Sequence, residues 1–495
     1  MKVFLFVQLT TTLALISNNH YVYAQEPCCE DYCLGKDNDY RQQSKKFTSN
    51  SVYQFVRGND LDIGFQVPNC TATKFWVTTR HGTRLPYRNI ILNSPRLEEL
   101  KAQILRNYLV LQTKPDTGAL CMEDFLSIQS WKFNSSIKPD MAIHLATQGY
   151  EDLKYLARTY QQIFPDILVK EYDPKKYVFH NTQNQRNEES FKAFSEGLFG
   201  PDVYQEIDRY LVPDENDTLL RGYKGCPAWK ENSRKTYNSN DNEYARFRQT
   251  ALVKKTISDI SRRLGFQDSL DFKDIALMWD TCRLEQAWFV NRSSIWCAAF
   301  TPAQLTVLEY YDDLRLYRSV GYEYELNSRV SCNLAKDMLV RLNKDGDPSA
   351  IVYISHSVTV ETLIVALGMR RDSVRPTANN YEAMANRKWK TSEINPFSSN
   401  FAAVKLECSS ENSNKTSEKA MFFLNQKRVE FDWCKQGLCD WQRVLQQYEH
   451  LYHANCTEYF CKATLPSSSH SGGEKLTTVG LGMSLFIFFI LVLLK

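Results

Sequence analysis

The sequence predicts an α/β fold, in which helices flank a β-sheet. Short apolar segments rich in β-branched and aromatic residues predict four buried strands, at residues 74–79, 177–181, 350–355 and 401–407. Longer segments with helical spacing lie at residues 95–112, 148–164, 188–198, 244–264 and 302–320. Because strands alternate with helices along the chain, a helix-flanked sheet is the expected architecture.

The region between the second and third predicted strands is expected to be a helical insertion. Residues 204–343 contain no convincing strand, so we expect them to cover one side of the sheet. Helix 302–320 opens with Thr301 as N-cap and Pro302 in its first turn. Residues 231–242 (ENSRKTYNSNDN) are mostly polar and predict a solvated loop.

The composition is that of an ordinary globular protein. The 495 residues are 43% hydrophobic and 24% charged, with 60 basic and 57 acidic side chains. These values exclude a disordered, collagenous or coiled-coil protein. A net charge of +3 over this length lacks the concentrated basic surface of a nucleic-acid binder, so no nucleic-acid partner is expected.

The first 24 residues have the layout of a secretory signal peptide. Lys2 precedes an apolar run at residues 3–16, and Val22-Tyr23-Ala24 resembles a small-residue cleavage site. A buried N-terminal helix is the alternative interpretation. Secretion predicts a mature chain that starts near Gln25, with residues 25–465 forming one domain that no Pro- or Gly-rich linker divides.

All fourteen cysteines follow the predicted signal peptide, so we expect them to pair as disulfides in an oxidising compartment. Cys434, Cys439, Cys456 and Cys461, with His450 and His453 between them, also have a spacing that could be drawn as a zinc site. In a secreted chain the disulfide interpretation is favoured, and no metal is expected.

Six glycosylation sequons agree with passage through the secretory pathway. They begin at Asn69, Asn134, Asn216, Asn291, Asn414 and Asn455. At the C-terminal end, a small and polar spacer at residues 466–478 precedes an apolar tail at residues 479–495. This pattern predicts a GPI-anchor signal, with a conventional membrane helix as the alternative. We therefore expect the folded part to face a lumen or the outside of the cell, or to be secreted.

The segment Arg80-His81-Gly82-Thr83-Arg84 directly follows the first predicted strand and has the chemistry of a phosphate site. Two guanidinium groups offer forked donors to phosphate oxygens, and Gly82 permits a close approach of the backbone. Ligands of α/β sheets settle at the carboxyl ends of strands, where this segment lies. The two cations favour the neutral form of His81, which leaves a ring nitrogen able to attack phosphorus.

This segment is the signature of the histidine phosphatase superfamily, and its Arg-His-Gly-Thr-Arg-x-Pro form resembles the acid phosphatase and phytase branch. Residues 183–199 (QNQRNEESFKAFSEGLF) resemble the segment that supplies a third arginine, here Arg186. Residues 350–368 (AIVYISHSVTVETLIVALG) resemble the strand that delivers a second histidine, here His356. Residues 296–329 resemble the cap of the multiple inositol polyphosphate phosphatase subgroup, as does the Cys28-Cys29 start of the mature chain.

The resemblance implies a Rossmann-like mixed sheet with flanking helices and a helical cap. It also implies that His81 forms a phosphohistidine, which water then cleaves, while Arg80, Arg84, Arg186 and His356 hold the phosphate oxygens. The implied substrates are inositol polyphosphates, with bisphosphoglycerate as a further candidate. No cofactor or metal is implied, and the sequence indicates no protein partner.

One position departs from the family pattern. The second histidine is followed in the family by a general acid, and an ungapped alignment from His356 to Gly368 places Val358 there. Glu361, one helical turn further on, is the candidate for a displaced proton donor. The alternative hypothesis is a catalytically weakened homologue that binds polyphosphorylated ligands. The intact arginines and His81 favour retained chemistry, because a binding protein needs no nucleophile.

Overall fold

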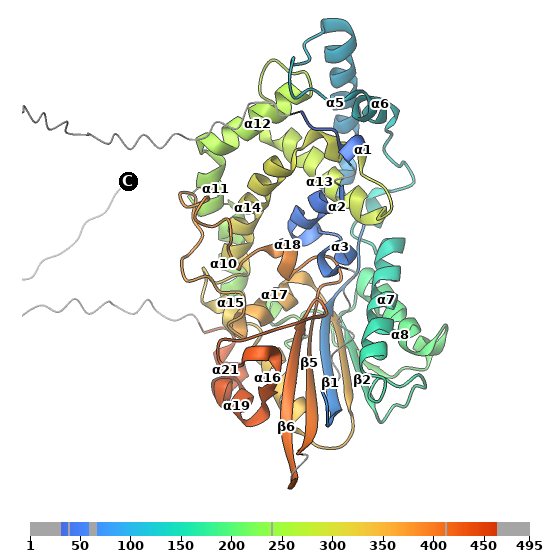
Figure 1. Ribbon diagram of the computed structural model, residues 1–495, viewed down its shortest axis with the longest axis vertical. Helices are drawn as coiled ribbons and strands as arrows, with labels where there is room; N and C mark the ends of the chain where they lie inside the picture. Colours follow the sequence, from blue (N-terminus) through green and yellow to red (C-terminus); the bar gives the residue numbers. More distant parts are fainter. Residues whose placement is uncertain (1–30, 38–39, 59–66, 239–240, 411–412, 463–495) are drawn as a thin grey trace, which may run out of the picture.

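The computed structural model describes residues 31–37, 40–58, 67–238, 241–410 and 413–462 of the chain. Its centre is an eight-stranded mixed sheet with the strand order β3-β2-β4-β1-β5-β6-β7, and β8 pairs with β6 (Figure 1). The strands are β1 Cys70–Arg80, β2 Tyr177–Asn181, β3 Arg209–Tyr210, β4 Ala350–Ser355, β5 Asn400–Ser410, β6 Ser413–Leu424, β7 Lys427–Arg428 and β8 Cys439–Asp440. The predicted α/β class is confirmed.

The parallel part of the sheet brings three strand ends to one edge. β1 and β2 both pair in parallel with β4, and Arg80 of β1 lies opposite Ser355 of β4. The four predicted strands are all present, and β1 and β5 extend beyond their predicted limits. β6 was missed because its first half is polar (SNKTSE) and only its end (AMFFL) carries the apolar signal.

Helices cover both faces of the sheet, as Figure 1 shows. One face packs against α7 Thr147–Ile163 and α8 Gln185–Phe199, through a core that includes Phe75, Leu156 and Phe194. The other packs against α16 Cys332–Asn343, α17 Ser357–Ala366 and α19 Trp441–Gln447, through a core that includes Trp76 and Leu339. Phe75 and Trp76 are successive residues of β1, so their side chains point to opposite faces of the sheet and pack in opposite cores.

A helical layer stands beyond the carboxyl edge of the sheet (Figure 1). Its main helices are α5 Ser94–Arg106, α6 Met122–Ser130, α12 Ala251–Arg263, α13 Phe272–Trp288 and α14 Pro302–Ser319. They share an apolar core with residues of the N-terminal segment, such as Phe47. The layer is thus assembled from three stretches of chain and is wider than the predicted insertion at 204–343. That stretch also contains β3, and α16 at its end packs on the sheet.

Shorter elements complete the described fold. The helices are α1 Leu34–Asp37, α2 Tyr40–Gln43, α3 Tyr53–Arg57, α4 Arg88–Leu92, α9 Gly222–Gly225, α10 Pro227–Asn238, α11 Glu243–Arg248, α15 Leu326–Arg329, α18 Thr391–Ile394, α20 Glu449–Tyr452 and α21 Cys456–Tyr459. The single-turn helix η2, Thr48–Asn50, lies in the N-terminal segment. Thr301 caps α14 in a full capping box with Gln304, as its sequence predicted.

Two local predictions were wrong. The predicted loop 231–242 is largely helical, because α10 is anchored by the buried Trp229, whose indole donates to Asn327, and carries ion pairs from Glu231 to Arg234 and Lys235. The predicted helix 244–264 is two helices, α11 and α12. It breaks at Thr250, whose hydroxyl accepts from the Val253 amide as a new N-cap.

Twelve of the fourteen cysteines form six disulfides, and Cys28 and Cys29 lie outside the described residues. The pairs are Cys33–Cys121, Cys70–Cys408, Cys226–Cys461, Cys282–Cys297, Cys332–Cys456 and Cys434–Cys439. The four cysteines of the alternative zinc interpretation are all oxidised. Two of these pairs attach the C-terminal segment to α16 and to the start of α10.

The predicted signal peptide, spacer and apolar tail lie outside the described residues. Within the described part, the structure contains no helix with both the length and the apolar character needed to cross a membrane. Of the sequon asparagines, Asn69, Asn134, Asn216, Asn291 and Asn455 are exposed, and the side chain of Asn414 is not described.

Removing the Cys70–Cys408 disulfide as C70S/C408S should lower the free energy of unfolding more than C434S/C439S does. The first disulfide closes a separation of 338 residues and the second one of 5. The chain-entropy relation gives about 6 kcal/mol for the long loop and about 2 kcal/mol for the short one. Urea unfolding of both double variants measures the difference, and equal losses would contradict this account.

Candidate active site

The five predicted phosphate-site residues come together at the carboxyl edge of the parallel strands. Arg80 ends β1, His356 follows β4, and the loop after β2 leads to Arg186 in the first turn of α8. The rings of His81 and His356 are 5.9 Å apart, and Arg186 Nη2 lies 3.3 Å from His356 Nδ1. Parallel strands that share an edge thus assemble residues more than 270 positions apart.

Gly82 permits a close contact within the protein. A Cβ atom at this position would lie 2.2 Å from the carbonyl oxygen of Gly149, and a Cβ at Gly149 would meet the Thr83 backbone equally closely. The two glycines therefore permit contact between the Arg80–Arg84 segment and the first turn of α7. The Gly82 amide also donates to Ser190 of α8. These contacts fix the backbone on which His81 stands.

The hydrogen bond of His81 determines which ring nitrogen is available. His81 Nδ1 lies 2.9 Å from the carbonyl oxygen of Gly82, which can only accept, so Nδ1 carries the proton and Nε2 keeps its lone pair. Burial, then the charges of Arg186 and Arg80, hold the pKa of His81 well below its usual range. The side chain is 4% exposed. His81 is therefore a neutral imidazole with a free Nε2 at neutral pH.

Backbone carbonyls fix the guanidinium of Arg80. Its Nη1 donates to the carbonyl oxygens of Ser49, Asn395 at 2.9 Å and Pro396 at 3.0 Å. Its buried Nε has no hydrogen-bond partner in the described structure. Burial, followed by the charge of Arg84, lowers the pKa of Arg80 to about 9, so the group stays charged at neutral pH. Arg80 thus keeps a free, charged donor beside His81.

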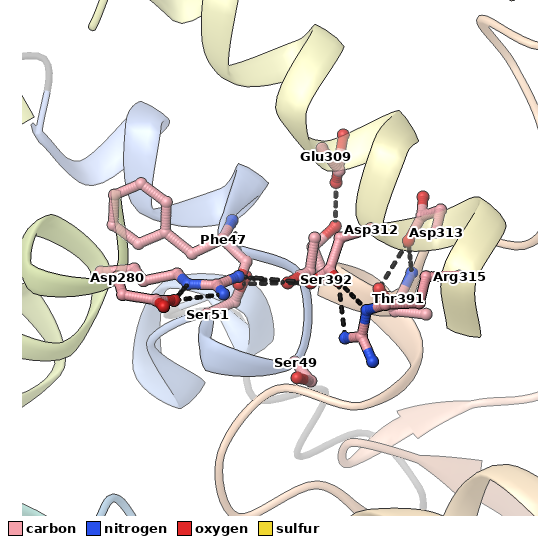
Figure 2. A network of polar contacts seen from close by, with 12 residues as sticks. Phe47, Ser49, Ser51, Asp280, Glu309, Asp312, Asp313, Arg315, Thr391 and Ser392 are labelled. Carbon is pink, nitrogen blue, oxygen red and sulfur yellow. Dashed lines mark hydrogen bonds and ion pairs between the residues drawn. The ribbon is translucent and has the colours of Figure 1, made fainter. Parts of the chain in front are cut away.

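Buried acids of α14 hold the two segments that supply these carbonyls (Figure 2). Asp312 accepts from Thr48, the neighbour of Ser49, and from Arg315. Asp313 accepts from both the amide and the hydroxyl of Thr391, in the helix that leads to Asn395. Asp312, Asp313 and Glu309 are each at most 4% exposed. The cap helix therefore positions Arg80 through its backbone neighbours.

Aromatic rings hold Arg84. Its guanidinium lies 4.1 Å from the ring centre of Tyr87 and 6.0 Å from that of Phe397, which also lies 4.6 Å from the Arg80 guanidinium. Tyr87 is 55% exposed, and Arg84 lowers its pKa. Among the described residues, no carboxylate pairs with Arg84, so its charge remains available at the site. Tyr87 was missed from the sequence because it lies just past the motif.

Hydrogen-bonding side chains of the loop after β2 and of the first turn of α8 hold His356. Its Nε2 lies 3.1 Å from the Thr182 hydroxyl and 3.3 Å from the Asn187 amide, while Nδ1 faces Arg186. Burial and Arg186 hold the pKa of His356 well below its usual range. Arg186 keeps a buried Nε without a partner among the described residues, and burial lowers its pKa to about 10.

Three further cations lie around the assembled phosphate site, and the sequence contained no signal for them. Arg221 and Lys224, at the start of α9, are among the charges that lower the pKa of His356. The charge of Arg315 of α14 lowers the pKa of Tyr87 and opposes the rise in the pKa of Glu361. Arg221 is paired with Asp214, and Arg315 with Asp312. The site thus carries more positive charge than one phosphate would neutralise.

Val358 and Glu361 lie in different surroundings on α17. Val358 packs against the apolar core that includes Trp76 and Leu339. Glu361 is 1% exposed and lies beside Asn395. Among the charges around it, those of Arg80 and Arg315 lower its pKa most. Burial raises its pKa to about 7, and its Oε1 has no hydrogen-bond partner in the described structure. Glu361 therefore lies on the side of Arg80 that also faces Asn395.

One further histidine lies outside the assembled site. His180, on β2, contacts Asp217 at 3.3 Å. Within the described ranges, one group has metal-ligand geometry, Cys33, Cys121 and Asp124, and its two sulfurs form a disulfide. That group therefore offers no thiolate to a metal ion.

Comparison with known proteins agrees with this geometry. The multiple inositol polyphosphate phosphatase 1 of Drosophila melanogaster is 42% identical over 459 residues, which cover 92% of this chain and 96% of the relative. The human protein of the same name is 24% identical over 420 residues, covering 81% of this chain and 83% of the relative.

Solved structures show the same fold. The phytase from D. castellii superimposes with a TM-score of 0.65 at 15% identity, over 84% of this chain and 87% of the phytase. Bifidobacterium longum multiple inositol polyphosphate phosphatase, in complex with inositol hexasulfate, gives 0.59 at 11% identity, over 82% and 97%. Residues 74–423 match the profile of the histidine phosphatase superfamily (branch 2), which spans every residue of the assembled site, and the chain belongs to that superfamily.

Proposed function

We propose that this protein is a phosphomonoesterase that removes phosphate from inositol polyphosphates through a phosphohistidine at His81. One observation carries the proposal: a neutral histidine with a free Nε2 is surrounded by arginines whose Nε donors are buried and unpartnered in the described structure, on Arg80 and Arg186. Forked guanidinium donors fit phosphate oxygens, and they stabilise the charge that develops during phosphoryl transfer.

The proposed reaction has two steps. His81 Nε2 attacks phosphorus in line with the ester oxygen, so that a P–N bond forms while the P–O bond breaks. The leaving oxygen takes a proton from Glu361, from another acid or from water, and the water consumed in the second step returns a proton. Water then attacks the phosphohistidine, the P–N bond breaks, and inorganic phosphate leaves with His81 neutral again. Arg80, Arg84, Arg186 and His356 hold the three phosphate oxygens in both steps.

The charge around the phosphate clamp supports a substrate with several phosphates. The clamp consists of Arg80, His81, Arg84, Arg186 and His356. Arg221 and Lys224 lie on the His356 side, while Arg315 lies on the side of Tyr87 and Glu361. Cations beyond the clamp suit phosphates that are not being cleaved, as on an inositol polyphosphate or bisphosphoglycerate. The relatives named for inositol polyphosphate phosphatase activity support the first class.

We also propose that the enzyme acts in the secretory pathway, on the outer face of the plasma membrane or as a secreted protein. Six disulfides support an oxidising compartment. The apolar tail at 479–495 suits attachment through a GPI anchor or a membrane helix.

A second candidate function rests on Val358. An inositol alkoxide is a poor leaving group, and a valine cannot protonate it. A protein with an intact clamp and impaired proton transfer would bind polyphosphorylated ligands without efficient turnover. Glu361 does not settle the matter, because its carboxyl lies beside Arg80 and Asn395 and is almost fully buried.

Purified protein should release inorganic phosphate from inositol hexakisphosphate between pH 4 and 7.5. Acidic quenching must be avoided when the phosphohistidine is trapped, because its P–N bond hydrolyses in acid. H81A should abolish both phosphate release and labelling by a 32P-phosphorylated substrate, because the P–N bond cannot form. H144A, outside the clamp, is the matched control. Tight binding of the substrate by the unmodified protein, with neither labelling nor turnover, would support the binding function instead.

R186Q should move the acid limb of kcat/KM for p-nitrophenyl phosphate to higher pH. Arg186 is the charge that most depresses the pKa of His81, so its removal raises that pKa towards 6.5, and protonated His81 cannot attack. R88Q, which removes an exposed arginine, is the control for net charge. An unchanged acid limb in R186Q would show that another group controls it.

E361Q should lower kcat for inositol hexakisphosphate and for p-nitrophenyl phosphate by similar factors, because it removes a buried carboxyl whose charge acts on Arg80. A general acid would behave differently: its loss costs about 10²- to 10⁴-fold with the poor inositol leaving group and little with nitrophenolate. V358E should raise turnover of the inositol substrate selectively, since it places a carboxyl at the first turn of α17. A leaving-group-dependent loss in E361Q would identify Glu361 as the proton donor.

A further inference from the structure

A cavity of about 300 Å³ lies at the β3 side of the sheet, and no residue of the phosphate clamp lines it. Its walls include His180 of β2, Tyr210 of β3, Arg341 of α16 and Tyr353 of β4. Residues 216–219, in the loop after β3, form another wall of the cavity. The cavity therefore combines two phenol rings, an imidazole and a cation.

This cavity opens at an unprotected edge of the sheet. β3 is the outermost strand on this side and pairs with β2 alone among the described strands. Tyr210 is 63% exposed and the adjoining Leu211 is 48% exposed. Edge strands with exposed apolar side chains invite pairing with other chains, and native proteins usually cover them.

Two buried polar atoms point to a ligand in the cavity. His180 Nε2 and Asp217 Oδ2 are 3.3 Å apart, yet neither has a hydrogen bond of acceptable geometry in the described structure. Their residues are 4% and 2% exposed. Buried polar groups are normally satisfied, so a group with hydroxyl or amide functions would complete both.

A sequon lies at the rim of the same cavity. Asn216 and Thr218 of the sequon Asn216-Asp217-Thr218 both line it and are both exposed. The backbone amide of Asn216 donates to the Pro213 carbonyl oxygen at 2.8 Å, so the asparagine that would carry a glycan lies on a tight, accessible turn. The sequon at Asn134 differs, because Ser136 donates to its carboxamide oxygen and the residue does not line this cavity.

We infer that Asn216 carries an N-linked glycan whose first N-acetylglucosamine packs into this cavity and covers the sheet edge. One pyranose face is apolar and packs on an aromatic ring, here Tyr210, while hydroxyl and acetamido groups reach His180 and Asp217. In the transfer, Asn216 Nδ2 loses a proton and bonds to C1 of the sugar, as the C1–O bond to a lipid pyrophosphate donor breaks. The inference requires the secretory route and is independent of the proposed catalysis.

The test uses the full chain secreted from eukaryotic cells, with N216Q compared to N134Q. Glycopeptide mass spectrometry should find Asn216 occupied. N216Q should lower Tm by about 2 °C or more and increase aggregation, whereas N134Q should do neither. Turnover of inositol hexakisphosphate at 25 °C should be equal in both, which separates this result from any failure of the proposed function.

Two further measurements keep the inference falsifiable if N216Q is not secreted. Trimming the folded protein with endoglycosidase H, which leaves one N-acetylglucosamine, should preserve Tm, while complete removal with peptide N-glycosidase F should lower it. Y210A should abolish the difference between the trimmed and fully deglycosylated forms. An unoccupied Asn216, equal Tm values for the two forms, or a difference that persists in Y210A would overturn the inference.

Discussion

Arg80, Arg84 and Arg186 lie together at one edge of the sheet, and their mutual repulsion is the constraint that the surrounding structure satisfies. Burial of like charges is unfavourable unless other groups solvate them. Here the solvating groups are mostly neutral: the carbonyls of Ser49, Asn395 and Pro396 and the ring of Phe397. Because few acids neutralise the clamp, its field depresses the pKa of both histidines and remains available to an anion.

The helical layer helps to hold the clamp arginines in place. Asp312 and Asp313 of α14 are buried, and each fixes one of the segments whose carbonyls hold Arg80 (Figure 2). Buried acids with several hydrogen bonds make a rigid connection, because each lost bond would leave a buried charge unsatisfied. The cap and the clamp are thus one hydrogen-bonded unit, although they come from distant parts of the chain.

Glu361 shows how one helical turn changes the role of a carboxyl. At the first turn of α17 a carboxyl would stand near His356, but a full turn later it lies beside Arg80 and Asn395. Burial raises its pKa, and the nearby Arg80 and Arg315 oppose that rise. A carboxyl in this position is suited to balancing the charge of a clamp arginine, and it lies one helical turn from the position that Val358 occupies.

The sequence by itself determined the α/β class and four of the strands, because short runs rich in β-branched and aromatic residues are local signals. Three short segments that resemble a known family identified the five residues of the phosphate clamp. The sequence could not determine β3 or β6, because β6 is polar in its first half and the pairing of both strands depends on neighbours already in place. Only the tertiary structure decided the helicity of residues 231–238, where Trp229 packs, and the contact of Gly82 with Gly149. The additional cations Arg221, Lys224 and Arg315 were also beyond prediction, since their proximity to the clamp arises from long-range packing and leaves no local pattern.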